Sequence, residues 1–387
     1  MKRCGRDAIT GRLVEVTVSQ ERIVEVRQLA DDAEAARRLP WISAGWIDLQ
    51  VNGFGGYDLN GERVTPEDIE GVTRALHARG VGAYLPTIIT GPIDRMRRAF
   101  ASIAVYVDER RFGSGSLAGI HMEGPYLSSE DGSRGAHPRA DIRDPDWDEF
   151  QRLQEAANGL IRMVTIAPER EGAIPFIRRL ADAGIVVAIG HTTASDEQLE
   201  QAVQAGAQVS THLGNGSQPV LPRHPNYIWQ QLADDRLWAT FIPDGHHLAP
   251  SVLKAMLRVK RERSIFVSDS VQLGGMAPGA YSSPIGGQVV LMENGRLHTA
   301  ANPSILAGSA SSLEEGIANA VRYTDMTLAE AVQAVTSRPA QLMRYEDRGM
   351  LQAGMRADLT LFRHEPGGRV WVAETVVAGE SVYRLEE

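Results

Sequence analysis

Four side chains that can bind a metal ion or carry a proton stand at the ends of four apolar runs in the middle of the chain. They are Glu123, His191, His212 and Asp269. Two imidazoles and one carboxylate make the three-ligand set of a catalytic divalent cation, which keeps one position open for water. Such a cation lowers the pKa of the water and polarises a carbonyl oxygen. The series therefore predicts a metal-dependent hydrolase.

Each of the four residues has an ordinary structural explanation when it is taken alone. A lone histidine after an apolar strand is commonly a core or loop residue, and Glu123 before Gly-Pro can simply end its strand. Asp269 before Ser270 can cap a helix. It is the joint placement of all four at strand ends that favours a site.

The elements that must position these side chains alternate between strand-like and helix-like segments. Eight apolar strands are predicted at residues 45–51, 83–89, 117–123, 163–167, 186–191, 208–212, 238–243 and 264–269. Amphipathic helices are predicted between them, such as those at 66–79, 174–183, 197–205 and 250–259. This order indicates an α/β fold, a (β/α)₈ TIM barrel of the metal-dependent hydrolase type, whose active site lies at the carboxyl ends of the strands. A doubly wound open sheet is the alternative, but no Gly-x-Gly-x-x-Gly follows the first strand.

Both ends of the chain have the alternating pattern of β structure. Strands are predicted at residues 12–18, 22–26, 357–362, 370–373, 375–377 and 381–383. Neither end can bury an apolar face alone. We therefore expect residues 1–44 and 346–387 to form one small β-sandwich domain, and residues 45–345 to form the catalytic barrel.

The bulk composition limits the partners and the compartment. A formal net charge of −9 argues against a nucleic-acid partner, which requires clustered Lys and Arg. No stretch approaches the roughly 18 uninterrupted apolar residues of a membrane span, and the first residues lack the apolar run of a signal peptide. The single cysteine, Cys4, fits a reducing compartment. We expect a cytoplasmic enzyme.

Seven short motifs occur in the order that characterises a known enzyme family. They lie at residues 121–125 (His-x-Glu-Gly-Pro), 190–192 (Gly-His-Thr), 211–215 (Thr-His-Leu-x-Asn), 244–247 (Asp-Gly-x-His), 268–270 (Ser-Asp-Ser), 306–309 (Leu-Ala-Gly-Ser) and 354–358 (Gly-x-x-Ala-Asp). Through them the chain resembles the amidohydrolase superfamily and, within it, the N-acetylglucosamine-6-phosphate deacetylase family.

This resemblance implies a role for each residue at the centre of the site. Glu123, His191 and His212 match the metal ligands. Asp269 matches the general base, which takes a proton from the attacking water and returns it to the departing amine. His137 is similar to the histidine that grips the substrate and helps to stabilise the oxyanion.

The resemblance also implies a surface that binds a phosphorylated amino sugar. Its members are Ala136, His137, Asn215, Gly216, Arg223, Asp244, His247, Leu306, Ala307 and Gly308. Asn215, Gly216 and Arg223 match positions that hold the phosphate, and the planar fork of arginine suits that group. In the family this arginine reaches across from a partner subunit, so a homodimer is the implied assembly.

Two departures from the family pattern bear on the metal and the substrate. Many amidohydrolases carry His-x-His at the end of the first strand, where this chain has Gln50 and Asn52. Neutral amides are poor zinc ligands, so we expect one metal ion, which Gln50 contacts through water. Zn²⁺ is the default, and Fe²⁺, Mn²⁺ or Co²⁺ would fit the same ligands. The second departure is at residues 214–217, where Gly-Asn-Gly-Ser replaces Phe/Tyr-Asn-Ala-Met and suggests a wider or more flexible pocket.

The leading hypothesis is hydrolysis of the N-acetyl group of an amino-sugar 6-phosphate, above all N-acetylglucosamine 6-phosphate. One alternative keeps the barrel and the metal but changes the substrate to another N-acyl or cyclic amide, or to an unphosphorylated or different N-acetyl hexosamine. A third hypothesis is an interaction protein on an inactive scaffold. It would require lost ligands, whereas all four residues of the opening series are present.

Overall fold

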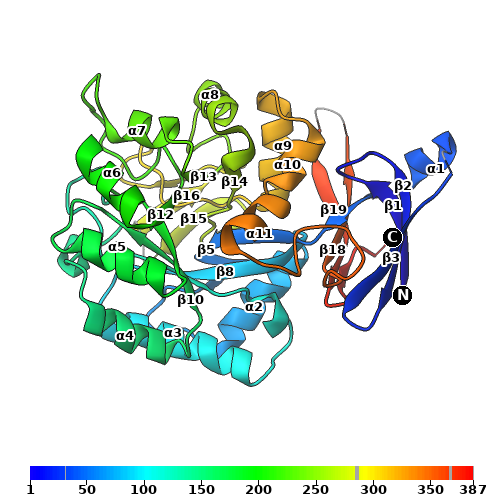
Figure 1. Cartoon of the computed structure of the whole chain (residues 1–387), viewed down its shortest axis with the longest axis horizontal. Coiled ribbons are helices and arrows are strands. Elements are labelled where there is room, and N and C mark those ends of the chain that lie inside the picture. Colours follow the sequence, from blue (N-terminus) through cyan, green and yellow to red (C-terminus); the bar gives the residue numbers. More distant parts are fainter. Residues whose placement is uncertain (31, 284–286, 366–367, 387) are drawn as a thin grey trace.

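A parallel eight-stranded barrel forms the middle of the chain (Figure 1) in a computed structural model that describes residues 1–30, 32–283, 287–365 and 368–386. Its strands, in spatial order, are β5 (Trp46–Val51), β8 (Val81–Ile89), β9 (Ile120–Glu123), β10 (Ile161–Ile166), β11 (Val186–Ile189), β12 (Ala207–Ser210), β13 (Trp238–Phe241) and β14 (Ser264–Phe266). A parallel bridge between Val51 and Ser270 brings the two edges together. The predicted barrel is therefore confirmed, and the open sheet is wrong.

Helices alternate with these strands and cover the outside of the barrel (Figure 1). They are α2 (Pro66–His77), α3 (Ile93–Asp108), α4 (Trp147–Ala156), α5 (Ala173–Asp182), α6 (Asp196–Ala205), α7 (Tyr227–Ala233) and α8 (Pro250–Lys260), followed by α9 (Leu313–Tyr323), α10 (Leu328–Gln333) and α11 (Ser337–Met343). Helix α2 shows how the sequence sets such a boundary. Thr65 and Asp68, on either side of Pro66, form a capping box, and the fixed φ of Pro66 suits the first turn.

The barrel interior is filled by apolar side chains below its mouth. Leu49, Leu85, Met163, Val209 and Ile265 belong to this inner cluster and are fully buried. Burial of each such side chain stabilises the fold by roughly 1.5–3 kcal/mol. The interior is filled in this way, and the cavity lined by predicted site residues lies at the carboxyl ends of the strands.

Both chain ends meet in a separate sheet beside the barrel, where Figure 1 places the two termini. Seven strands of the described chain form it in the order β20 (Glu380–Arg384), β19 (Val370–Val377), β18 (Leu359–His364), β4 (Trp41–Ala44), β1 (Lys2–Asp7), β2 (Leu13–Ser19) and β3 (Arg22–Gln28). The expected union of the two ends is confirmed, and hydrogen bonds link these strands into one continuous sheet. Strand β1 was not predicted, because its polar residues lack the alternating pattern. Helix α1 (Ala33–Arg38) connects β3 to β4. The domain boundaries at residues 44 and 346 stay a prediction.

A small antiparallel sheet follows the last barrel strand and was not predicted. Its strands are β15 (Gly279–Ser283), β16 (Gly287–Leu291) and β17 (Leu297–Thr299). It packs on Val271 and Ala307 through its own apolar cluster. The chain on either side of the sheet therefore returns to the barrel mouth. A second short hairpin, β6 (Gly53–Phe54) with β7 (Tyr57–Asp58), follows β5.

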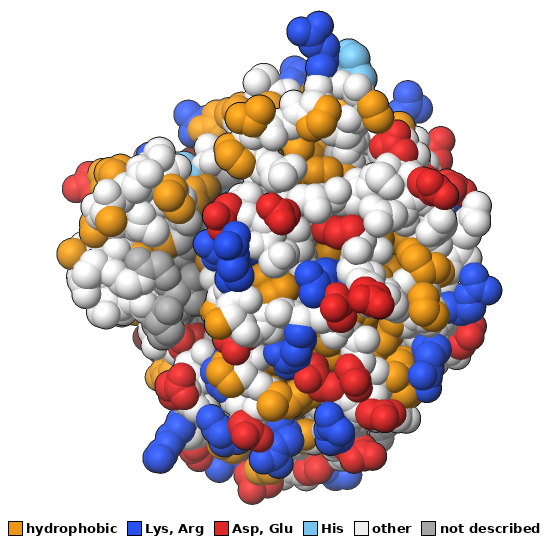
Figure 2. Space-filling model, turned by 90° about the vertical axis from the view of Figure 1, so that its left-hand side faces the viewer, with side chains coloured by type: hydrophobic (Ala, Val, Ile, Leu, Met, Phe, Trp, Pro, Cys, Tyr) orange, Lys and Arg blue, Asp and Glu red, His pale blue; other side chains and the backbone are white. Residues whose placement is uncertain are grey.

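The molecular surface carries charges of both signs. The face in Figure 2 intersperses Lys and Arg with Asp and Glu side chains. Among the described residues, no helix combines the length and the apolar character that crossing a membrane requires.

Candidate active site

The four residues of the opening series stand at the carboxyl end of the barrel because each ends or follows a barrel strand. Glu123 is the last residue of β9, and the other three follow β11, β12 and β14 by two or three residues. His191, His212 and Asp269 have φ of 50°, 30° and 47°. Histidine and aspartate tolerate this left-handed region better than most side chains. The chain therefore leaves the extended conformation of each strand at the residue that carries the reactive side chain.

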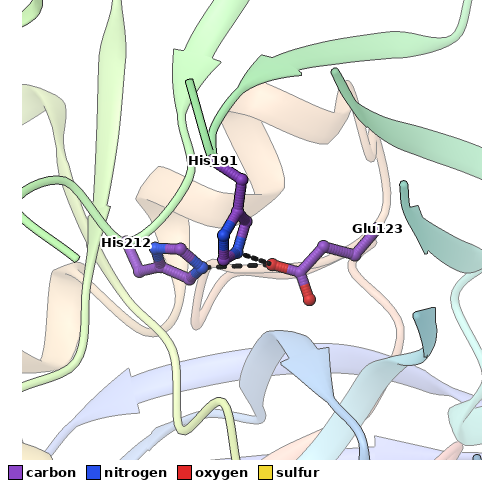
Figure 3. Close-up of side chains that lie close together, drawn as sticks. All are labelled: Glu123, His191 and His212. Atoms are coloured by element: carbon purple, nitrogen blue, oxygen red, sulfur yellow. Dashed lines mark hydrogen bonds and ion pairs between the residues drawn. The ribbon is translucent and has the colours of Figure 1, made fainter. Parts of the chain in front are cut away.

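Two imidazoles converge on one carboxylate oxygen (Figure 3). Nε2 of His191 lies 3.2 Å and Nε2 of His212 lies 3.1 Å from Oε1 of Glu123. All three side chains are buried, and one ligand atom from each falls within 4.8 Å of the others. The structure thus brings together the three residues that the resemblance implies as metal ligands.

The donor set fits a divalent cation. Nδ1 of His191 lies 2.8 Å from the carbonyl oxygen of Ser133, which can only accept, so Nδ1 carries the proton. Nε2 of His191 and Nε2 of His212 both face the carboxylate of Glu123, and a positive charge between these atoms, whether a proton or a metal ion, stabilises the arrangement. Two nitrogens with one oxygen suit zinc and its neighbours.

The pKa shifts in the cluster indicate that Glu123 is ionised. Burial raises the pKa of Glu123, but hydrogen bonds from His191 and His212 outweigh it and hold that pKa well below its ordinary value. Burial lowers the pKa of His212, but the hydrogen bond to Glu123 and its negative charge raise it overall. The carboxylate therefore stays ionised and attracts a cation.

Two amide side chains from β5 and its end hold the carboxylates in place. Nε2 of Gln50 donates to Oε1 of Glu123 at 3.0 Å. Nδ2 of Asn52 donates to Oδ1 of Asp269 at 2.7 Å. Gln50 was predicted near the metal, whereas Asn52 was noted in the sequence only as a replaced ligand. The Gln-x-Asn spacing was the signal for Asn52, because residues two apart on a strand share a face.

The predicted general base and the predicted oxyanion-stabilising histidine both have shifted pKa values. Burial, and then the charge of Glu123, raises the pKa of Asp269 to about 6. Burial, and then the neighbouring His191, lowers the pKa of His137 to about 3, so this imidazole is neutral at pH 7. Nδ1 of His137 lies 2.8 Å from Oγ1 of Thr90, which sequence reasoning did not single out.

A cavity of about 320 Å³ opens above the cluster. Among the predicted site residues, its lining includes Glu123, Ala136, His137, His191, His212, Asn215, Gly216, His247, Asp269, Leu306 and Gly308. Asn52 and several apolar residues complete the wall.

Four predicted site residues do not line this cavity. Gln50 and Asp244 instead contact residues that line it, because Nε2 of Gln50 donates to Oε1 of Glu123 at 3.0 Å and Oδ2 of Asp244 accepts from Nδ1 of His247 at 2.6 Å. Ala307 is buried in the apolar cluster of the small sheet. Arg223 is exposed on the loop before α7 and makes no hydrogen bond or ion pair within the described part of the chain.

Comparisons with known proteins agree with this site. A model described as the Amidohydrolase family matches residues 318–383. An N-acetylgalactosamine-6-phosphate deacetylase of Escherichia coli O157:H7 is 32% identical over 81% of each chain. An N-acetylglucosamine-6-phosphate deacetylase of Bos taurus is 32% identical over 89% of this chain and 84% of its own. The solved structure of a mutant N-acetyl-D-glucosamine-6-phosphate deacetylase from Mycobacterium smegmatis, in complex with N-acetyl-D-glucosamine-6-phosphate, superposes with a TM-score of 0.87 at 29% identity over 99% of both chains.

Proposed function

The chain belongs to the N-acetylglucosamine-6-phosphate deacetylase family of the amidohydrolase superfamily, and from this premise we propose that it hydrolyses the N-acetyl group of an amino-sugar 6-phosphate. The products are acetate and the free amine. The observation that carries the proposal is the convergence of Glu123, His191 and His212 beneath a cavity that Asp269 and His137 also line. N-acetylglucosamine 6-phosphate is the first substrate to test.

We assign Glu123, His191 and His212 as the ligands of one divalent metal ion. Zn²⁺ is the first choice for two imidazoles and a carboxylate, and Fe²⁺, Mn²⁺ and Co²⁺ suit the same donors. When bound, the ion would supply a water of lowered pKa and a polarised amide carbonyl. Gln50 steadies Glu123 by its hydrogen bond, and its contact to the ion through water is part of the same proposal.

Asp269 handles the proton in both halves of the reaction. It takes a proton from the attacking water as the carbon–oxygen bond forms, and returns it to nitrogen as the carbon–nitrogen bond breaks. The hydrogen bond from Asn52 fixes the carboxylate for both steps. When the Thr90 hydroxyl donates to Nδ1 of His137, the proton of Nε2 is free to stabilise the oxyanion in the cavity.

We infer that the sugar and its phosphate occupy the rest of the cavity. Ala136, His247, Leu306 and Gly308 would contact the sugar, and Asn215 with Gly216 would hold the phosphate. Asp244 sets the orientation of His247. Ala307, between Leu306 and Gly308 in the chain, is buried in the apolar cluster of the small sheet.

Arg223 completes the phosphate site of a partner subunit in this proposal. The loop and helix around it expose Val220 (83%) and Trp229 (56%), which favours an apolar interface between two copies of the chain. The proposed assembly is a homodimer in the cytoplasm, without a membrane or nucleic-acid partner.

An acetate-release assay tests the function. Purified protein is loaded with Zn²⁺ and given N-acetylglucosamine, N-acetylgalactosamine and N-acetylmannosamine, each with and without a 6-phosphate. We expect release from at least one phosphorylated sugar and little from the free sugars. Equal release with and without the phosphate would refute the phosphate site, and no release from any member of the panel would refute the deacetylase.

A different N-acetyl hexosamine is the second candidate substrate. Residues 214–217 depart from the family pattern beside the proposed phosphate end, and one relative is an N-acetylgalactosamine-6-phosphate deacetylase. The same panel separates the candidates, because N-acetylgalactosamine and N-acetylmannosamine each differ from N-acetylglucosamine in the configuration of one carbon.

A further inference from the structure

The imidazole of His191 is enclosed by the backbone of two loops. Gly135 lies on the loop after β9, and Gly216 lies on the loop after β12. Both line the cavity, and both have φ of 55°, which favours glycine. The two loops are therefore shaped for a close approach to one side chain.

The space around the ring leaves no room for a side chain at position 216. A Cβ there would lie 2.6 Å from Nδ1 and 2.7 Å from Cε1 of His191, and one at position 135 would lie 3.1 Å from Cε1. Atoms at 2.6 Å overlap, so the ring or the loop would have to move. The contact at position 135 is only tight.

The ring itself cannot move aside cheaply. Its Nδ1 donates to the carbonyl oxygen of Ser133 at 2.8 Å. The rings of His137 and His212 stand edge-on to it, with centroids 4.4 and 4.9 Å away. A displaced ring would lose the hydrogen bond to Ser133 and would turn Nε2 away from Glu123.

We propose that Gly135 and Gly216 are positioning residues that clamp the imidazole of His191 and thereby raise the affinity of the site for its metal ion. This inference rests on the proposed metal centre. The clamp works because neither residue has a Cβ, so backbone atoms rather than flexible side chains bound the ring. Rigid walls keep Nε2 aimed at the point where Glu123 and His212 converge.

The residue at position 216 also differs from the family pattern. Sequences of the family usually carry alanine there, in Asn-Ala-Met, where this chain has Asn-Gly-Ser. In this structure the glycine lets the loop run close to His191. The family's usual alanine should not fit this loop unaltered.

Zinc affinity of metal-free protein tests the clamp. Zn²⁺ is titrated against a chromophoric chelator for the wild type, Gly216→Ala, Gly135→Ala and a control, Gly172→Ala. Gly172 has φ of 74° and no atom within 4 Å of a Cβ, so the control carries the backbone strain without the clash. Thermal unfolding of the metal-free proteins measures that strain separately.

We expect G216A to raise the Kd for Zn²⁺ by about tenfold or more, as loss of groups that orient a ligand does. G135A should raise it less, and G172A should leave it within about twofold of the wild type. The visible absorption of Co²⁺-loaded G216A should also differ from that of the wild type, because the ligand geometry has changed.

A G216A protein that binds Zn²⁺ as tightly as G172A would refute the proposed clamp. If G216A does not fold, an unchanged Kd in G135A has the same force. A wild type that binds none of Zn²⁺, Fe²⁺, Mn²⁺ and Co²⁺ would instead refute the metal centre itself, and the clamp with it.

Discussion

The side chains around Glu123 do not balance its negative charge. Oε1 of Glu123 accepts from Gln50 and also faces the ring nitrogens of His191 and His212. Only one of these neighbours, the amide, is an unconditional donor. A buried carboxylate with this surrounding costs free energy unless a cation joins it. The site therefore requires a positive charge beside the carboxylate of Glu123.

Asp269 should be indispensable for turnover but not for metal binding. Replacement by asparagine removes the group that accepts the proton, so we expect acetate release to fall by about 10²–10⁴-fold. Zinc content should stay at the wild-type level, since the ligands are untouched. The exposed Asp182→Asn on α5 is the control and should behave as the wild type. Unchanged activity in D269N would remove Asp269 from the mechanism.

Asn52 should set the acidic limb of the pH profile. Its hydrogen bond favours the ionised carboxylate and so lowers the pKa of Asp269. In Asn52→Ala this pKa rises, and the acidic limb of kcat/KM should shift to higher pH. The comparison is made between pH 5 and 9 at constant metal. A limb that stays in place or moves to lower pH would contradict the assignment.

Among the elements, α2 has a second role besides covering the barrel. Its last residue, His77, accepts at its carbonyl oxygen from Oγ1 of Thr375 in β19 at 2.6 Å. Its ring lies 2.9 Å from Oγ of Ser116 and packs edge-on against Phe112. The helix thus joins the barrel to the sheet of the chain ends through one buried residue.

His77 should make stability fall on acidification. Burial lowers its pKa to about 4, below the ordinary 6.5. Between these two values the unfolded chain binds a proton at His77 and the folded protein does not. The stabilisation is complete above pH 6.5 and is lost as the pH falls toward 4. Between pH 7.5 and 5 we expect a loss of about 2 kcal/mol in the free energy of unfolding.

The variant His77→Gln isolates this effect. It keeps a polar side chain near Ser116 but cannot titrate, so its free energy of unfolding should fall by about 2 kcal/mol less than that of the wild type over the same pH range. Urea unfolding at the two pH values measures the difference. Parallel loss in both proteins would assign the acid sensitivity to other groups.

At the scale of the whole molecule, Arg223 is not among the residues that line the reactive cavity. Arg223 is exposed outside the cavity that should receive the phosphate. On the face in Figure 2, charges of both signs are interspersed. In the proposed homodimer, this arginine would reach the substrate of the partner subunit.

Subunit complementation tests that assembly. Arg223→Ala and Asp269→Asn chains, each nearly inactive alone, are co-expressed and purified together. If Arg223 serves the partner's site, each mixed dimer has one complete site, and random pairing restores roughly a quarter of wild-type activity. Activity that stays at the level of the separate variants would show that Arg223 acts within its own chain or not at all.

The sequence by itself determined the barrel and the residues at its mouth. Apolar runs of strand length that end in Glu123, His191, His212 and Asp269 fix both the element and the position of the side chain. In a parallel barrel the carboxyl ends of all strands share one face. The positions of these four residues at strand ends therefore sufficed to predict that they meet. The seven short motifs predicted the family.

Only the tertiary structure decided how these side chains are held. Asn52 and Asp269 are 217 residues apart, and nothing in either segment encodes their hydrogen bond. The small sheet β15–β17 and strand β1 likewise escaped the pattern, because short or polar strands carry little periodicity. The enclosure of His191 by Gly135 and Gly216 depends on two loops that approach it from different strands. Local patterns specify elements, whereas distances between loops follow from the packing of the whole barrel.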